Sequence, residues 1–235
     1  MRLAGLLLLA AQLHGACSGT IYLTIDTGNM EPAEEIAGIL RKHGVKATFF
    51  LADEKTKRGD STLDLSWAPF WRRLAEEGHA FGSHTWRHWY FRRDLPNRKV
   101  AYVQKGGSTE ALDQKGLCEE LSKVDRRFHE MTGRYLDRLW RAPGGKTTPG
   151  VLRMAKACEW RHVGWTANGF LGDELSSATY PNRKLLTQSL RDIRNGEILV
   201  MHLGIWSRKD PYWPMLDPLL AGLKQKGFCF STLRP

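Results

Sequence analysis

The sequence contains few cysteines. Four are present in 235 residues, and Cys17 lies at the end of an apolar N-terminal segment. If that segment is removed, Cys118, Cys158 and Cys229 remain, an odd number that does not describe a disulfide scaffold. We therefore expect at most one bridge, and the sequence does not choose its pairing.

Long hydrophobic runs are also scarce. The one extended run, from Leu3 to Leu13, follows a positively charged start and precedes small residues up to Ser18, the pattern of a secretory signal peptide. The run is too short to cross a bilayer comfortably, and no second one is long enough. We predict a signal peptide over 1–18 and a soluble, exported domain over 19–235, periplasmic or extracellular. A membrane anchor and lipidation of Cys17 stay open as alternatives.

Acidic residues are outnumbered by basic ones. The chain has 25 Asp and Glu against 35 Lys and Arg, a formal charge of +10, which favours an anionic partner. The basic residues are interspersed with acids along the predicted helices, and no nucleic-acid motif occurs. We therefore expect an anionic cell-wall polymer and no nucleic acid, with a merely solvated surface as the alternative.

A repeated local pattern predicts the fold. Four times an amphipathic stretch ends in a Gly and an apolar run follows, at Gly44, Gly78, Gly196 and Gly227; each Gly is read as a turn of positive φ that ends a helix. Helices are expected from Pro32 and over 117–131, 148–158, 185–193 and 216–226. Helices that alternate with short buried strands indicate parallel βα units. Six to eight units predict an α/β fold, a barrel or distorted (β/α) barrel, with 53–66 and 92–114 as loops over the catalytic face.

Residues with catalytic chemistry follow four of the predicted strands: Asp26, His84, Arg141 and His202. The carboxyl ends of parallel strands meet at one edge, so we expect a single site there. His84 and His88 are four residues apart, as on one face of a helix, and offer two imidazole ligands to a metal ion. A third ligand and an open position would make the centre catalytic, with Asp26 and His202 as candidate general base and general acid.

These residues carry a family resemblance. Over residues 20–233 the chain resembles the polysaccharide deacetylase family, also called NodB homology or carbohydrate esterase family four. The family motifs TFDDG, HxxxH, Arg-x-Pro and Leu-x-x-His correspond to Thr24-Ile25-Asp26-Thr27-Gly28, to His84 and His88, to Arg141-Ala142-Pro143, and to Leu199-Val200-Met201-His202. Each motif alone is weak, but four in the expected order form a strong signal.

The resemblance implies a distorted (β/α) barrel and a metal-dependent hydrolase. Its reaction would remove N-acetyl groups from an N-acetylhexosamine in an envelope glycan, such as peptidoglycan, or in a secreted polysaccharide. Asp26 would be the general base, His84 and His88 metal ligands, Arg141 the residue that orients the base, and His202 the general acid. The implied metal is zinc, with cobalt, nickel or manganese as alternatives.

Two departures from the family pattern bear on this interpretation. Thr27 stands where the family has a second aspartate, a metal ligand, and a hydroxyl is a poorer ligand than a carboxylate. The third ligand is then Asp26, Thr27 or Glu54, or the site holds little metal. After Trp165, where the family often has an aspartate that pairs with the arginine, the chain has the neutral Asn168. Since a buried unpaired guanidinium is costly, we expect an acid near Arg141, such as Asp173 or Glu174.

Candidate substrate contacts are aromatic. Aromatic rings stack on the apolar faces of sugars, and Trp86, Trp165 and Trp206, together with Pro143, lie beside the motifs. Lys146 and Arg208 are candidate contacts for an anionic substrate. Two other functions stay open: a catalytically weak glycan-binding protein on the same barrel, and an amide hydrolase acting on a small molecule.

Overall fold

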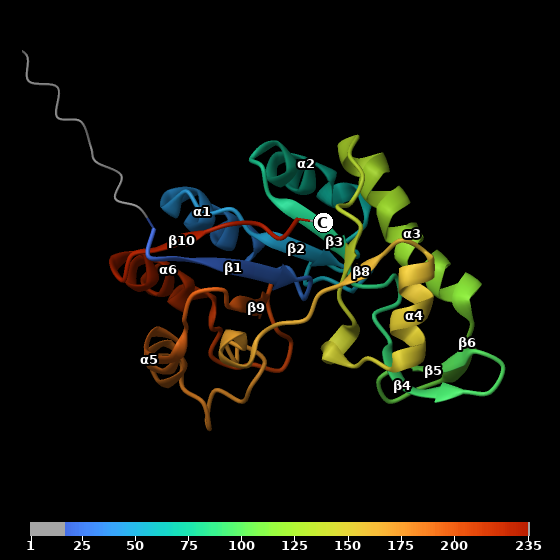
Figure 1. The fold of residues 1–235 in the computed structure, drawn as a ribbon. Helices are drawn as coiled ribbons and strands as arrows, with labels where there is room; N and C mark the ends of the chain where they lie inside the picture. Colours follow the sequence, from blue (N-terminus) through green and yellow to red (C-terminus); the bar gives the residue numbers. More distant parts are fainter. Residues whose placement is uncertain (1–16, 235) are drawn as a thin grey trace, which may run out of the picture.

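The computed structural model describes residues 17–234, and its centre is a curled parallel sheet (Figure 1). The strand order is β10-β1-β2-β3-β7-β8, with β9 also paired to β1. The strands are β1 (Gly19–Asp26), β2 (Thr48–Leu51), β3 (Ala80–Ser83), β7 (Leu139–Trp140), β8 (Arg161–His162), β9 (Ile198–His202) and β10 (Phe228–Phe230). Between β8 and β9 an isolated parallel bridge joins Phe170 to Val200. The predicted distorted (β/α) fold is confirmed.

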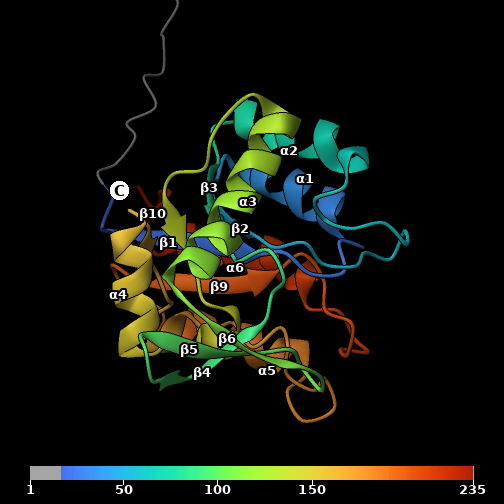
Figure 2. The same ribbon diagram turned by 90° about the vertical axis from the view of Figure 1, so that its right-hand side faces the viewer.

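Within residues 17–234 the chain forms six α-helices, which lie around the sheet in both ribbon views (Figures 1 and 2). They are α1 (Ala33–His43), α2 (Ala68–Glu76), α3 (Gln114–Thr132), α4 (Pro149–Ala157), α5 (Asn182–Asp192) and α6 (Leu216–Gln225). In α1 the apolar spacing works as predicted, because Ile36, Ala37 and Leu40 are buried against the sheet. The four glycines of the repeated pattern all have positive φ, between 60° and 89°. The repeated glycines therefore mark helix ends and turns, as the sequence predicted.

One predicted loop is a small sheet instead. Within 92–114 the chain forms most of a three-stranded antiparallel sheet made of β4 (Tyr90–Leu95), β5 (Lys99–Val103) and β6 (Thr109–Leu112). Three residues, 96–98, connect β4 to β5, and Asn97 and Arg98 among them have φ of 58° and 54°. The loop prediction was wrong there because the sequence lacks the Asn-Gly or Asp-Gly pair that marks the commonest hairpins. The other predicted loop, 53–66, is mostly irregular.

Two disulfides are present, Cys17–Cys229 and Cys118–Cys158. The expectation of at most one bridge was wrong, because Cys17 belongs to the folded domain and restores an even number. Its bridge ties the start of β1 to β10, and the second bridge ties α3 to the end of α4. Residues 1–16 of the predicted signal peptide lie outside the described residues.

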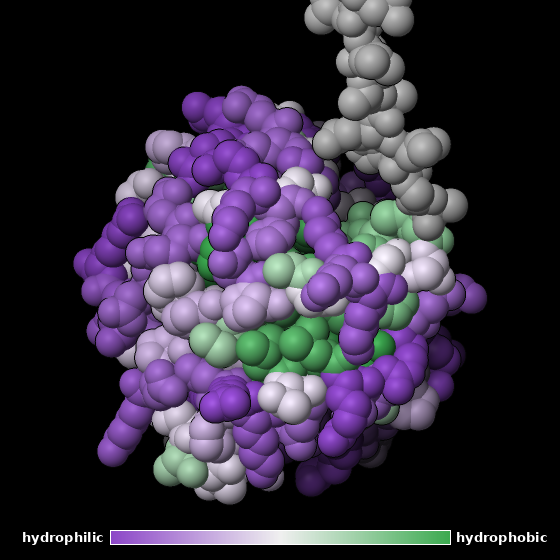
Figure 3. Space-filling view, turned by 90° about the vertical axis from the view of Figure 1, so that its left-hand side faces the viewer, coloured by the Kyte–Doolittle hydropathy of each residue, from purple (hydrophilic) through white to green (hydrophobic). Residues whose placement is uncertain are grey.

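The surface agrees with the polar composition. The face turned to the viewer in Figure 3 is largely hydrophilic around one apolar area. Among residues 17–234 no helix combines the length and the apolar character needed to cross a membrane.

Gly28, in the first motif, stands where two backbones nearly touch. A Cβ atom at this position would lie 2.1 Å from the carbonyl oxygen of Gly204, in the segment that follows β9. We expect Gly28→Ala to lower the free energy of unfolding by about 2–3 kcal/mol, because neither backbone can move freely. Urea unfolding measures this. Gly38→Ala, inside α1 with nothing within 4 Å of the new methyl group, is the control and should raise stability by about 0.5–1 kcal/mol; equal effects would contradict the close-approach explanation.

Candidate active site

Neighbouring strand ends bring the predicted residues together. Asp26 ends β1 and is the register partner of His202, which ends β9. Ser83 of β3 is likewise the partner of Trp140 of β7, so the residues that follow these two, His84 and Arg141, emerge side by side. This register places the four predicted residues at one edge of the sheet.

The two histidines meet in a loop, and the predicted helix is absent. Residues 84–89 have no regular secondary structure, and Thr85 and His88 have φ of 64° and 56°. These turns fold the loop back so that the ring centroids of His84 and His88 lie 4.8 Å apart. The pairing of the two imidazoles was therefore predicted correctly, although its helical cause was not.

Asp26 is held by Arg141. Arg141 Nη1 donates to Asp26 Oδ1 at 2.8 Å, and its other nitrogens donate to the carbonyl oxygens of Val163 and Gly164. Burial alone would raise the pKa of Asp26, but the charge and hydrogen bond of Arg141, together with the nearby histidines, lower it below its ordinary value. Asp26 is thus an ionised carboxylate in a buried place.

The acid near Arg141 is therefore Asp26, and the pairing expected with Asp173 or Glu174 is absent. Asn168 donates to Glu197 instead. The costly case of a buried, unpaired guanidinium is avoided, and the arginine is set to orient the carboxylate.

His84 presents one ring nitrogen to the site. Its Nδ1 lies 2.9 Å from the carbonyl oxygen of Arg141, which can only accept, so Nδ1 carries the proton and Nε2 holds a lone pair. Nε2 lies 3.5 Å from Asp26 Oδ2. Burial lowers the pKa of His84 to about 3, so the imidazole is neutral. A neutral imidazole oriented by a backbone carbonyl is the form that binds metal ions.

Glu54 lies next to the position where a carboxylate is missing. The Thr27 hydroxyl donates to Glu54 Oε2 at 2.6 Å, and Glu54 Oε1 lies 3.2 Å from His88 Nδ1. No group of three His, Cys, Asp or Glu side chains among the described residues is already arranged to hold a metal ion. The donor chemistry nevertheless fits one, since two imidazoles and a carboxylate form a familiar ligand set for catalytic zinc.

His202 is paired with Asp173, a partner that sequence reasoning assigned elsewhere. Asp173 Oδ2 accepts from the His202 backbone N–H at 2.7 Å, and its Oδ1 lies 3.1 Å from Nδ1 of the ring. Burial would lower the pKa of His202, but the charge and hydrogen bond of Asp173, with smaller effects of Asp26 and Glu174, raise it to about 9. The ring is therefore cationic at neutral pH and able to give up a proton from Nε2.

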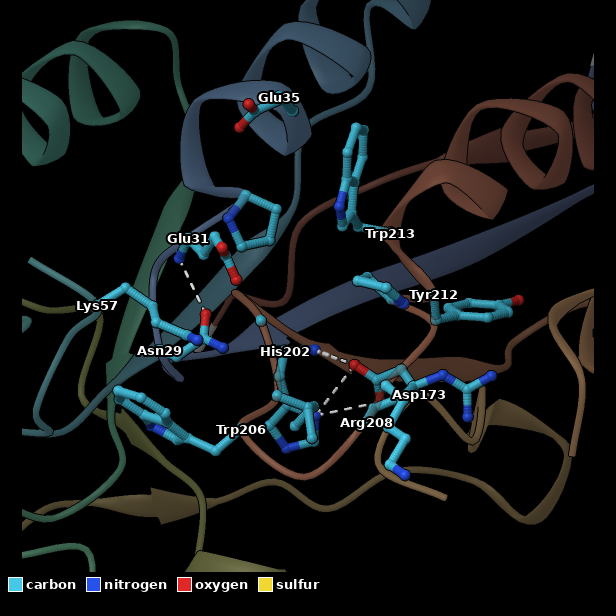
Figure 4. Close-up of a pocket in the computed structure, with 15 residues that line it drawn as sticks. Asn29, Glu31, Glu35, Lys57, Asp173, His202, Trp206, Arg208, Tyr212 and Trp213 are labelled. Atoms are coloured by element: carbon cyan, nitrogen blue, oxygen red, sulfur yellow. Dashed lines mark hydrogen bonds and ion pairs between the residues drawn. The ribbon is translucent and has the colours of Figure 1, made fainter. Parts of the chain in front are cut away.

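A cleft of about 470 Å³ opens on His202. In Figure 4 the imidazole lies between Asp173 and Trp206, with Trp213 further along the wall. Trp206 is 56% exposed and has Lys57 Nζ 5.1 Å from its ring centroid. Sequence reasoning proposed Trp206 but missed Lys57, whose loop gave no signal.

The other proposed substrate contacts lie away from the walls of this cleft. Trp86 packs against the core with Lys123 Nζ 4.0 Å from its ring centroid. Trp165 stacks on Phe170, and Pro143 is buried. Arg208 does line the cleft, but its guanidinium is taken up by the carbonyls of Leu175, Tyr180 and Asp210 and by Asn182. The expectation that Arg208 meets an anionic substrate was therefore wrong, because its donors are already used; Lys146 is exposed.

The motif set agrees with a family-wide pattern. The sequence profile of the polysaccharide deacetylase family matches residues 15–163, more than half of the chain. The chain belongs to the polysaccharide deacetylase family. This places it among hydrolases that act on carbon–nitrogen bonds other than peptide bonds.

Relatives of this family are similar along most of the chain. A peptidoglycan-N-acetylglucosamine deacetylase of Bacillus cereus is 26% identical over 91% of this chain and 66% of its own length. The chain spans only 54% of the length of another relative, the protein YlxY of Bacillus subtilis.

Solved structures share the fold. A family 4 acetyl xylan esterase of Clostridium thermocellum, in complex with a cobalt ion, superposes with a TM-score of 0.69 at 20% identity and covers 91% of this chain and 87% of its own. A pseudoenzyme of carbohydrate esterase family 4 from Bacillus anthracis has a TM-score of 0.66 at 22% identity, covering 92% and 64%.

Proposed function

We propose that this polysaccharide deacetylase is a working, metal-dependent hydrolase that removes the N-acetyl group of an N-acetylhexosamine in a glycan. One observation carries the proposal. The ionised Asp26, oriented by Arg141, and the cationic His202, oriented by Asp173, end neighbouring strands at the same edge of the sheet. The pKa of Asp26 is lowered and that of His202 is raised. Such opposite shifts in two neighbouring groups are typical of a general base and a general acid.

The residues divide the reaction between them. Asp26 accepts a proton from the attacking water, whose oxygen adds to the acetyl carbonyl carbon. His202 then donates its Nε2 proton to the amide nitrogen as the carbon–nitrogen bond breaks, so acetate and a free amine leave. Asp173 keeps His202 protonated before this step, and Arg141 keeps Asp26 ionised and fixed in direction. The open cleft beside Trp206 admits the sugar.

His84, His88 and Glu54 would hold the divalent ion, which we propose to be zinc, with cobalt, nickel or manganese as alternatives. A divalent ion there would polarise the acetyl carbonyl and favour loss of the proton from water. Thr27, hydrogen-bonded to Glu54, would orient the carboxylate that replaces the family's second aspartate. Asp26 is left for proton transfer because Arg141 already holds it.

We further propose that the protein is exported and acts on an envelope or secreted glycan. Two disulfides favour an oxidising compartment. Because Cys17 forms one of them, we propose that any cleavage of the predicted leader falls before Cys17 and not after residue 18. The name of the Bacillus cereus relative suggests peptidoglycan as the substrate. The identity of the glycan and the compartment are independent of each other, so one can be wrong while the other holds.

Acetate release tests the function. Purified protein should release acetate from N-acetylglucosamine oligomers or from peptidoglycan when zinc, cobalt, nickel or manganese is supplied, and a chelator should stop the release. No acetate from either substrate with any of the four metals would overturn the proposal. Acetate from small acetamides but not from oligomers would instead support an amide hydrolase acting on small molecules.

A second candidate is a glycan-binding protein that has lost catalysis. Thr27 is the observation that favours it, and a pseudoenzyme with the same fold exists in Bacillus anthracis. Tight, stoichiometric metal binding would argue against this candidate. Glycan binding without metal or acetate release would support it.

A further inference from the structure

A second cleft lies away from His202. It has a volume of about 590 Å³ and lies between the β4–β5 turn and the N-terminal ends of α3 and α4. In Figure 2 the small sheet runs below α4 and beside the lower end of α3. We call it the basic groove; its lining residues of interest are Asp94, Arg98, Lys99, Asp113, Lys115 and Arg153.

The cations of the basic groove are not paired within the protein. Arg98, Lys99, Lys115 and Arg153 line one cavity, and within residues 17–234 none of the four makes an ion pair with an Asp or Glu. Four like charges around one hollow repel one another unless an anion lies between them. The arrangement therefore favours an anionic ligand.

The two acids of the groove serve the helices. Asp94 accepts from the Thr148 hydroxyl and from the backbone N–H of Gly150 in the first turn of α4. Asp113 accepts from the backbone N–H of Gly116 and caps α3. Both carboxylates are held by the N-terminal ends of the two helices but keep their charge, so four cations and two acids give the groove a net formal charge of 4 − 2 = +2.

Arg98 stands where a glycine would be easier to accommodate. It is the last residue of the three-residue turn 96–98 and has φ of 54°, a backbone conformation that L side chains adopt at a cost. Replacing it with glycine relieves that cost and removes the charge. This gives a variant that separates binding from folding.

We infer that the basic groove binds carboxylate or phosphate groups of an anionic polysaccharide. No aromatic ring lines it on which a base could stack, and it is concave and polar, unlike a surface that inserts into a membrane. β4 starts two residues after His88 and runs to the groove over six residues, roughly 20 Å. An extended polymer can thus contact both places, which raises its effective concentration at the active site; that second step rests on the proposed function, whereas anion binding does not.

Calorimetry with the full chain tests the inference without turnover. The probes are polygalacturonate for carboxylate, wall teichoic acid for phosphate and hydroxyethyl cellulose as a neutral polymer. We expect binding of at least one anionic polymer, weakened by salt, and none of the neutral one. Binding of polygalacturonate alone identifies carboxylate as the recognised group, and binding of teichoic acid alone identifies phosphate. In the triple variant Arg98→Gly, Lys115→Gln, Arg153→Gln, affinity should fall about tenfold or more, since each exposed charge contributes a small factor.

A control variant with the same loss of charge distinguishes binding at the groove from a general effect of net charge. Lys105→Gln, Lys156→Gln, Arg183→Gln removes the same charge from three exposed residues that form no ion pair within the described chain, and affinity should stay within about twofold. Thermal melting should show both triples folded, with Arg98→Gly alone at least as stable as the parent. Equal weakening by the two triples, or no binding of either anionic polymer, would overturn the inference, whatever the acetate assay shows.

Discussion

Replacing His202 with alanine should lower kcat for deacetylation by roughly 10²–10⁴-fold, because the leaving amine loses its proton donor. His202 does not belong to the proposed metal-binding set, so metal content, measured by elemental analysis, should be unchanged. KM should change little. Full activity in His202→Ala would show that another group protonates the amine.

The same residue sets the alkaline limb of the pH profile. Asp173 raises the pKa of His202 to about 9, so the acid form is present at neutral pH and kcat should fall as the pH rises through about 9. In Asp173→Asn the raising charge is lost and burial favours the neutral ring, so the limb should move to below pH 7. An unmoved limb would assign it to a different group. Glu31→Gln, in the same cleft but without contact to His202, is the control and should leave the limb in place.

Replacing Glu54 with glutamine should weaken metal affinity by about 100-fold or more, since the carboxylate that completes the two-histidine set becomes a neutral amide. A zinc competition titration with a chromophoric chelator measures this directly, without substrate. Unchanged affinity in Glu54→Gln would mean that Asp26 or Thr27 completes the site.

Restoring an aspartate at position 27 gives a second test of Glu54 as the metal ligand. Thr27→Asp alone places a second carboxylate about where the hydroxyl now meets Glu54 at 2.6 Å, so repulsion should limit any gain in affinity. The double variant Thr27→Asp, Glu54→Gln moves the carboxylate to the position of the family motif, and metal affinity should recover to near the parent value. Failure of the double variant with a well-folded protein would count against Glu54 as a stand-in for the family aspartate.

Much of the site could be predicted from the chain because its residues follow short buried strands. Asp26, His84, Arg141 and His202 each come at the end of an apolar run, and in a parallel sheet such ends share an edge. Local patterning and the family motifs were therefore enough to gather them.

Prediction failed where a contact depends on a loop or on a distant partner. His84 and His88 were placed on a helix because their spacing fits one, but left-handed backbone at Thr85 brings the rings together instead. Asp173 or Glu174 was expected to pair with Arg141, and only the folded chain shows that Asp173 holds His202 while Asp26 holds the arginine. Side-chain pairing across such separations leaves no local periodicity to read.

The sequence by itself determined the α/β class, the order of the motifs and which residues are proposed as acid, base and imidazole ligands, because periodicity and residue chemistry are local properties. Tertiary structure alone decided that Cys17 bridges to Cys229, that Glu54 lies against Thr27 and His88, and that four cations converge on one groove. Each of these depends on segments far apart in the chain, or on how a turn aims a side chain. Such distances exist only once the sheet has curled and its helices have packed.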